Sequence, residues 1–62
     1  MIPKEGQTVR VVFDGGFEFD CIVRAVKTKK AFGHVRVLIT PLCGAGESWV
    51  DAGRIVQLVD GL

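Results

Sequence analysis

Hydrophobic and polar residues alternate along most of this chain with the two-residue period of β-strands. Residues 8–13 are the first such stretch, in which Arg10 falls on the polar side. The sequence Asp14-Gly15-Gly16 follows, and these residues tolerate the positive φ angles of a tight reversal. We therefore expect a strand that turns back into an antiparallel partner. Its predicted inward side chains are Val9, Val11 and Phe13.

The second predicted strand, residues 17–28, begins with strict alternation and is longer than an ordinary strand. Apolar residues occupy both of its sides between Ile22 and Val26, so we expect a bend or bulge there. The side chains predicted to face the core are Phe17, Phe19, Cys21, Val23 and Ala25.

Three further strands are predicted at residues 34–42, 47–50 and 55–59. Residues 51–54 between the last two suit a single 3-10 turn. No stretch of the chain has the period of a helix of ordinary length. The inward side chains expected in the third strand are Val35, Val37 and Ile39.

Five short antiparallel strands predict one all-β domain, residues 1–62, closed into a small barrel because an open sheet would leave long edges unpaired. A content of 48% hydrophobic and 24% charged residues excludes intrinsic disorder. The layout resembles the SH3-like small-barrel superfold, which includes Tudor, KOW and type II dihydrofolate reductase domains. The resemblance rests on the turn at residues 14–16, the long second strand and residues 49–55, Trp-Val-Asp-Ala-Gly-Arg-Ile. It implies a five-stranded antiparallel SH3-like barrel with a short 3-10 turn before the last strand.

The resemblance does not extend to the functional residues of those families. The reductase motif Val-Gln-Ile-Tyr falls on Glu47-Ser48-Trp49-Val50, so we expect no folate or nicotinamide binding, while oligomerisation stays open. The methyl-lysine cage of Tudor domains needs several exposed rings, whereas the pattern leaves only Phe32 and Trp49 for that role.

Enzymatic and metal chemistry find no support in the residue pattern. The chain has one histidine, one serine and no tyrosine, and no spacing joins a nucleophile to a base. Cys21, His34 and Cys43 are isolated from one another, without the spacing of a metal site. We therefore expect a non-enzymatic protein with no cofactor and no metal.

Charge is distributed unevenly, although the net charge is only +1. No acidic residue lies between Asp20 and Glu47, so this middle segment is a basic block that suits a polyanion. We predict weak, salt-sensitive nucleic-acid binding, with DNA and RNA both open; the alternative is a solvated lysine loop that protects a strand edge. The residues predicted to contact nucleic acid, including two that could stack on bases, are Arg24, Lys27, Lys29, Lys30, Phe32, His34 and Arg36.

A second predicted function is protein interaction or homo-oligomeric assembly. Apolar residues at alternate positions should face outward on neighbouring strands, and exposed aliphatic groups of this kind mark partner surfaces. A bend could return Ile22 and Val26 to the core. The residues predicted for this interface are Val12, Ile22, Val26, Leu38 and Trp49.

The ends of the chain and its cysteines indicate the compartment. Residues 1–6 contain no apolar signal-peptide segment, and no apolar run reaches membrane-spanning length. We expect a cytoplasmic protein without membrane contact, in which Cys21 and Cys43 are reduced thiols.

Overall fold

Five antiparallel strands make up the fold in the computed structural model, which describes residues 2–29 and 33–59. The all-β class and the single 3-10 turn before the last strand are confirmed. The elements are β1 (Thr8–Val12), β2 (Glu18–Lys29), β3 (His34–Pro41), β4 (Ser48–Asp51), the 3-10 turn η1 (Ala52–Arg54) and β5 (Ile55–Leu58).

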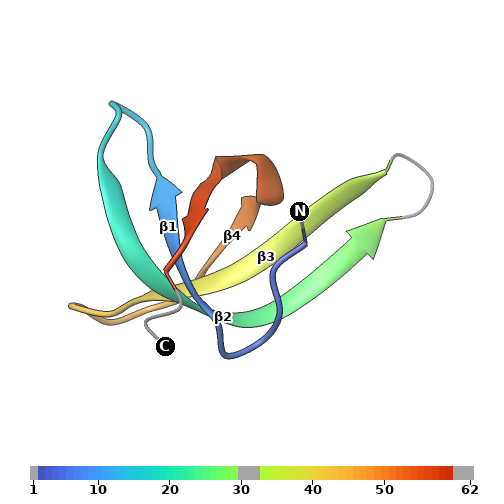
Figure 1. The fold of residues 1–62 in the computed structure, drawn as a ribbon, viewed down its shortest axis with the longest axis horizontal. Helices are drawn as coiled ribbons and strands as arrows, with labels where there is room; N and C mark the ends of the chain where they lie inside the picture. The colour runs from blue at the N-terminus through green and yellow to red at the C-terminus, as the bar shows by residue number, and fades with distance from the viewer. Residues whose placement is uncertain (1, 30–32, 60–62) are drawn as a thin grey trace.

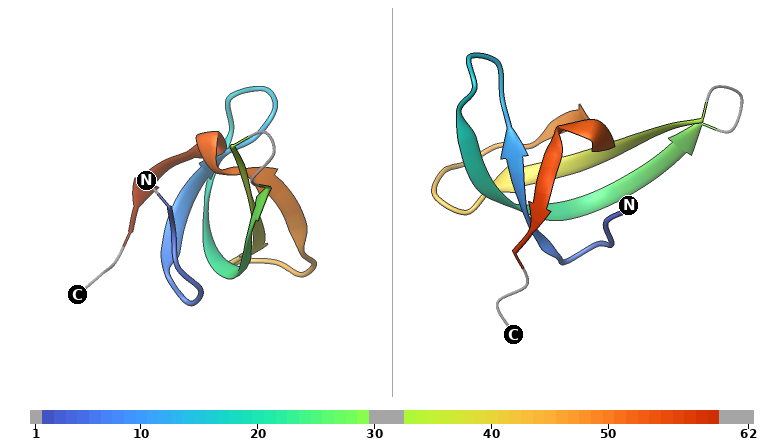
Figure 2. Two further views of the ribbon diagram at one scale, coloured as in Figure 1. Left: turned by 90° about the vertical axis from the view of Figure 1, so that its right-hand side faces the viewer. Right: turned by 45° about the horizontal axis from the view of Figure 1, so that its top comes forward.

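The strands form one sheet in the order β4-β3-β2-β1-β5. The long β2 lies at its centre and curves strongly, so that the sheet curls around its inward face (Figure 1). β4 and β5 are the two edges of this sheet, and η1 carries the chain from one to the other (Figure 2). The curl therefore gives an inward face that holds the core and an outward face open to solvent.

A bulge at Arg24 divides β2 into two parts. Val23 lies opposite Ile39, but Ala25 lies opposite Leu38, so Arg24 is an extra residue in the ladder. This confirms the bend expected between Ile22 and Val26. An extra residue reverses the side to which all following side chains point.

The reversal corrects two predicted orientations. Val26 lies opposite the buried Val37 and packs against the core, so its predicted outward orientation is wrong. Ala25 was expected inward but lies on the outward face beside Leu38. The two orientations were predicted wrongly because strict alternation takes no account of the extra residue at Arg24.

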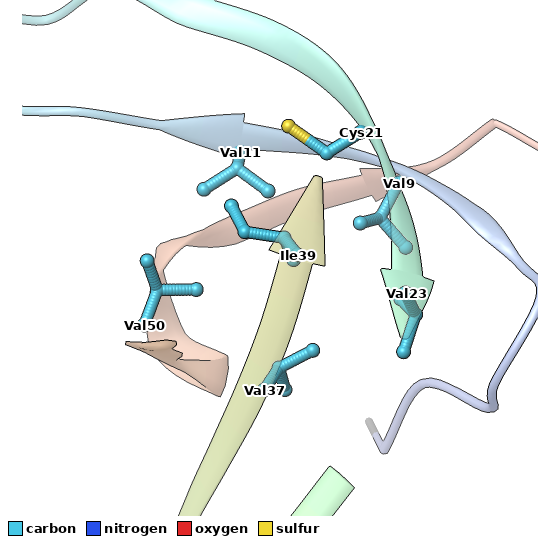
Figure 3. Packing of buried hydrophobic residues seen from close by; sticks show 7 residues of the cluster. All are labelled: Val9, Val11, Cys21, Val23, Val37, Ile39 and Val50. Carbon is cyan, nitrogen blue, oxygen red and sulfur yellow. The ribbon is translucent and has the colours of Figure 1, made fainter. Parts of the chain in front are cut away.

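The core consists of small aliphatic side chains drawn from β1 to β4 (Figure 3). Among the described residues, none of the fully buried side chains is larger than isoleucine.

Burial in this core raises the pKa of the Cys21 thiol, because the thiolate would lose its solvation. Cys21 and the exposed Cys43 are both free cysteines. The buried cluster is Val9, Val11, Cys21, Val23, Val37, Ile39 and Val50.

Two aromatic side chains predicted to be buried are exposed. Phe17 and Phe19 expose 64% and 52% of their surface. Phe19 does lie opposite the buried Val11, as the alternation requires. However, β3 ends at Pro41, opposite Cys21, so no strand covers the beginning of β2 on that side. Phe17 and Phe19 therefore lie at an open end of the curled sheet and not in the core.

The turn between β1 and β2 forms as expected. Gly15 and Gly16 have φ angles of 88° and 85°, which are strained for side-chain-bearing residues. Arg54 of η1 donates a 2.9 Å hydrogen bond to the Asp14 carboxylate, which links this turn to the end of the chain. Within residues 2–29 and 33–59, no helix has the length and apolar character needed to span a bilayer.

Candidate nucleic-acid interface

The basic residues of β2 and β3 lie on the outward face of the sheet. Lys27 lies opposite Arg36, and both side chains are exposed. The bulge determines this placement, because Val26 and Val37, which precede and follow them in their strands, point inward. The two cations are therefore direct cross-strand neighbours on a solvent-exposed surface.

Trp49 completes this surface from the neighbouring strand β4. Its side chain is 39% exposed, which confirms the partial exposure expected from the sequence. The Lys27 ammonium nitrogen lies 5.3 Å from the centroid of the Trp49 ring, in a cation–π arrangement. Lys27, Thr28, Arg36 and Trp49 together line a hollow of about 380 Å³, which we call the basic–aromatic face.

Two carboxylates, one just before β4 and one at its end, lie close to arginines of β2 and β3. Glu47 lies 3.5 Å from Arg24, and Asp51 lies 3.8 Å from Arg36. Both pairs are solvent-exposed, and such pairs contribute about 0–1 kcal/mol. The basic block is free of acidic residues in sequence, but β3–β4 pairing brings acidic groups beside it. Its positive potential is therefore lower than its sequence indicates.

The remaining predicted contacts follow Lys27 in the sequence. Lys29 is the last residue of β2 and lies opposite His34, so the paired strands extend beyond Lys27. Lys30 and Phe32 lie outside the described residues. The exposed His34 lines a separate hollow of about 510 Å³ near η1.

The aromatic residue of this face is not the one that the sequence predicts for it. Phe32 was expected to stack on bases, whereas Trp49 was assigned to a protein interface. The structure brings Trp49 beside Lys27, although 22 positions separate them in the chain. Trp49 lies beside Lys27 because β4 pairs with β3, with Leu38 opposite Trp49. Alternation in the sequence does not predict this pairing.

The residues predicted for a protein interface do not form one patch. Leu38 and Trp49 are cross-strand neighbours, and the half-buried Ile22 shares their sheet face. Val12 lies opposite Glu18 at the far end of β2, which separates it from Leu38. Val26 belongs to the core.

No protein-family model, curated protein or solved structure matches the chain. In the described part of the chain, His, Cys, Asp and Glu form no group of three that could hold a metal ion. The geometry of the outward face is therefore the basis for assigning a function.

Proposed function

We propose that this protein is a non-enzymatic binding module that binds single-stranded nucleic acid weakly through the basic–aromatic face. The observation that carries the proposal is the Lys27 ammonium group 5.3 Å from the Trp49 ring, with Arg36 in the same hollow. A base can stack on an exposed indole while neighbouring cations contact the phosphates on either side. Stacking of this kind is tolerant of sequence, so no base specificity is expected.

The affinity should be low because the positive charges are few and partly compensated. A phosphate approaching Arg36 competes with Asp51, whose carboxylate is 3.8 Å away and exposed. Exposed pairs of this length are weak, so a phosphate can replace the carboxylate at small cost. Lys29 and Lys30, the next basic residues in the sequence, are proposed to contact further phosphates. Contact with three or four phosphates would give a slope of log K against log salt of roughly −2 to −3.

The proposal includes the SH3-like small-barrel layout and a cytoplasmic location. The layout is supported by the strand order β4-β3-β2-β1-β5, a bent β2 and a 3-10 turn before β5. The location is supported by two free cysteines, because oxidising compartments favour disulfides.

A titration of a labelled oligothymidylate of about 16 nucleotides, followed by fluorescence anisotropy at low salt, tests this function. Lys27→Glu should weaken binding by at least about tenfold, because it replaces an attraction to phosphate with a repulsion. Lys4→Glu is the matched control, since it makes the same change of charge at an exposed residue of the segment before β1.

Two results would reject nucleic-acid binding at this face. One is the absence of measurable binding by the unaltered protein at low salt. The other is an equal loss of affinity in Lys27→Glu and Lys4→Glu, which would mean that only the net charge matters.

A second candidate function is protein docking on the same outward face. The cross-strand pair of Leu38 and Trp49, with the half-buried Ile22 nearby, favours it. An apolar contact should persist or strengthen as salt rises, whereas phosphate contacts weaken. Leu38→Lys should abolish such docking and leave the protein folded.

A further inference from the structure

A second surface lies at the opposite end of β2 from the basic–aromatic face. Phe17, Phe19 and Leu42 expose 64%, 52% and 50% of their surfaces there. Phe17 accepts a 2.6 Å backbone hydrogen bond from Phe13, whose ring meets that of Phe19 edge-on at 5.5 Å. Phe19 and Leu42 line a common hollow of about 320 Å³. We call the surface formed by Phe13, Phe17, Phe19 and Leu42 the aromatic end.

The exposed apolar area is large for so small a protein. Each phenylalanine side chain can bury 150–250 Å², so the exposed parts of the two rings and Leu42 together amount to roughly 300 Å². Patches of this size on monomers are often functional. Two such patches face to face would remove about 600 Å² of apolar surface from water. With the polar rim added, the buried area approaches the lower range of specific interfaces, about 1,200 Å².

The rim of the aromatic end carries charges of both signs. Arg10 lies 3.0 Å from Asp20, and Arg54 lies 2.9 Å from Asp14. The exposed Glu18 lies between the two exposed phenylalanines in sequence. These carboxylates would repel a polyanion, which argues against nucleic acid here. A two-fold interface sets the same patch against itself, so a rim with both signs suits a second copy of the chain.

The core provides an independent reason for association. The fully buried side chains among the described residues are valine, isoleucine and cysteine, while two of the aromatic rings remain outside. Dimerisation would cover those rings and stabilise the folded chain by mass action.

We propose that two copies of this chain form a symmetric dimer through the aromatic end, with Phe17, Phe19 and Leu42 at its centre. The basic–aromatic face lies at the other end of β2 and stays exposed in both copies. Self-association is thus independent of nucleic-acid binding.

Sedimentation equilibrium at protein concentrations up to about 1 mM tests the dimer. The unaltered protein should show a reversible monomer–dimer equilibrium. Phe17→Ser and Leu42→Ser should each raise the dimer dissociation constant by at least about tenfold, because a symmetric interface loses each contact twice. Neither change touches the buried cluster, and circular dichroism verifies that both variants are folded.

Ile2→Ser is the matched control, because Ile2 is 62% exposed and lines the hollow beside Gly33 and His34, at the opposite end of the β2–β3 hairpin from the aromatic end. It should leave the dissociation constant unchanged, as should Lys27→Glu. A protein that is monomeric at every concentration overturns the proposal. So does a dimer that Phe17→Ser and Leu42→Ser leave intact, or one that Ile2→Ser weakens equally.

Discussion

Lys27 and Trp49 define the chemistry of the outward face at the scale of single residues. An exposed cation–π contact stabilises by about 0.5–1 kcal/mol, so the lysine can leave the ring for a phosphate at little cost. A base can then occupy the ring face. The sequence indicates both residues but for different functions, because nothing in their spacing shows that β4 lies beside β3.

The two cysteine thiols should differ sharply in reactivity. Cys43 is exposed, whereas Cys21 is buried and its pKa is raised by desolvation, which disfavours the reactive thiolate. Ellman's reagent should therefore modify Cys43 rapidly in the native protein and Cys21 only after unfolding. A Cys43→Ser variant should show no fast phase. Rapid modification of that variant would mean that Cys21 is accessible.

The raised pKa of Cys21 also affects stability. An unfolded thiol ionises near pH 8.5, while the folded thiol ionises at higher pH. The contribution of Cys21 to the free energy of unfolding is thus fully present below about pH 8.5. The free energy of unfolding falls as the pH rises above that value. Guanidinium denaturation on either side of this pH measures the fall, which Cys21→Ala should reduce. If the free energy of unfolding of Cys21→Ala falls with pH as much as that of the unaltered protein, other groups cause the fall.

At the scale of elements, the bulge at Arg24 decides which side chains share a face. The sequence predicted a bend between residues 22 and 26 from apolar residues on both sides of the strand. It did not show which residue is extra, because residues alternate both before and after the bulge whichever residue of this stretch is the extra one. The orientations of Ala25 and Val26 were consequently exchanged, while those of Val9, Val11, Cys21 and Val23 were predicted correctly.

Deletion of Arg24 should leave the protein folded, because it removes the extra residue and makes the β2–β3 ladder regular. Ala25, Val26 and Lys27 would then keep their present partners in β3, with Val26 toward the core and Lys27 toward solvent. Arg24→Ala is the control, because it keeps the bulge and removes only an exposed pair with Glu47, which should change stability by less than about 1 kcal/mol. Chemical denaturation compares the two. A deletion variant that unfolds, while Arg24→Ala stays folded, would mean that Arg24 is not the extra residue of the ladder.

At the scale of the whole molecule, a small core supports two different surfaces at the two ends of β2. Strand number, the first hairpin and the 3-10 turn could be predicted, because alternation and turn residues are local signals. The exposure of Phe17 and Phe19 could not, since it depends on where β3 ends. The pairing of Arg24 and Arg36 with Glu47 and Asp51 is also non-local.

The small core implies a low tolerance to cavities. A chain of 62 residues has a free energy of unfolding of about 3–9 kcal/mol. Ile39→Ala, at one of the largest buried side chains, should remove about 2–5 kcal/mol of it. Val56→Ala, at an exposed residue of β5, should change it by less than about 0.5 kcal/mol. Thermal denaturation measures both, and a tolerated Ile39→Ala would show that the core lies elsewhere.

The most direct measurement of nucleic-acid binding is the fluorescence of Trp49, the single tryptophan, during titration with an unlabelled single strand at several salt concentrations. Stacking of a base on the indole should quench the emission saturably at low salt. The binding constant should then fall with a logarithmic slope of roughly −2 to −3, and by less in Lys29→Glu with Lys30→Glu. Emission that does not change at low salt, or a change that is independent of salt, would contradict the proposed function.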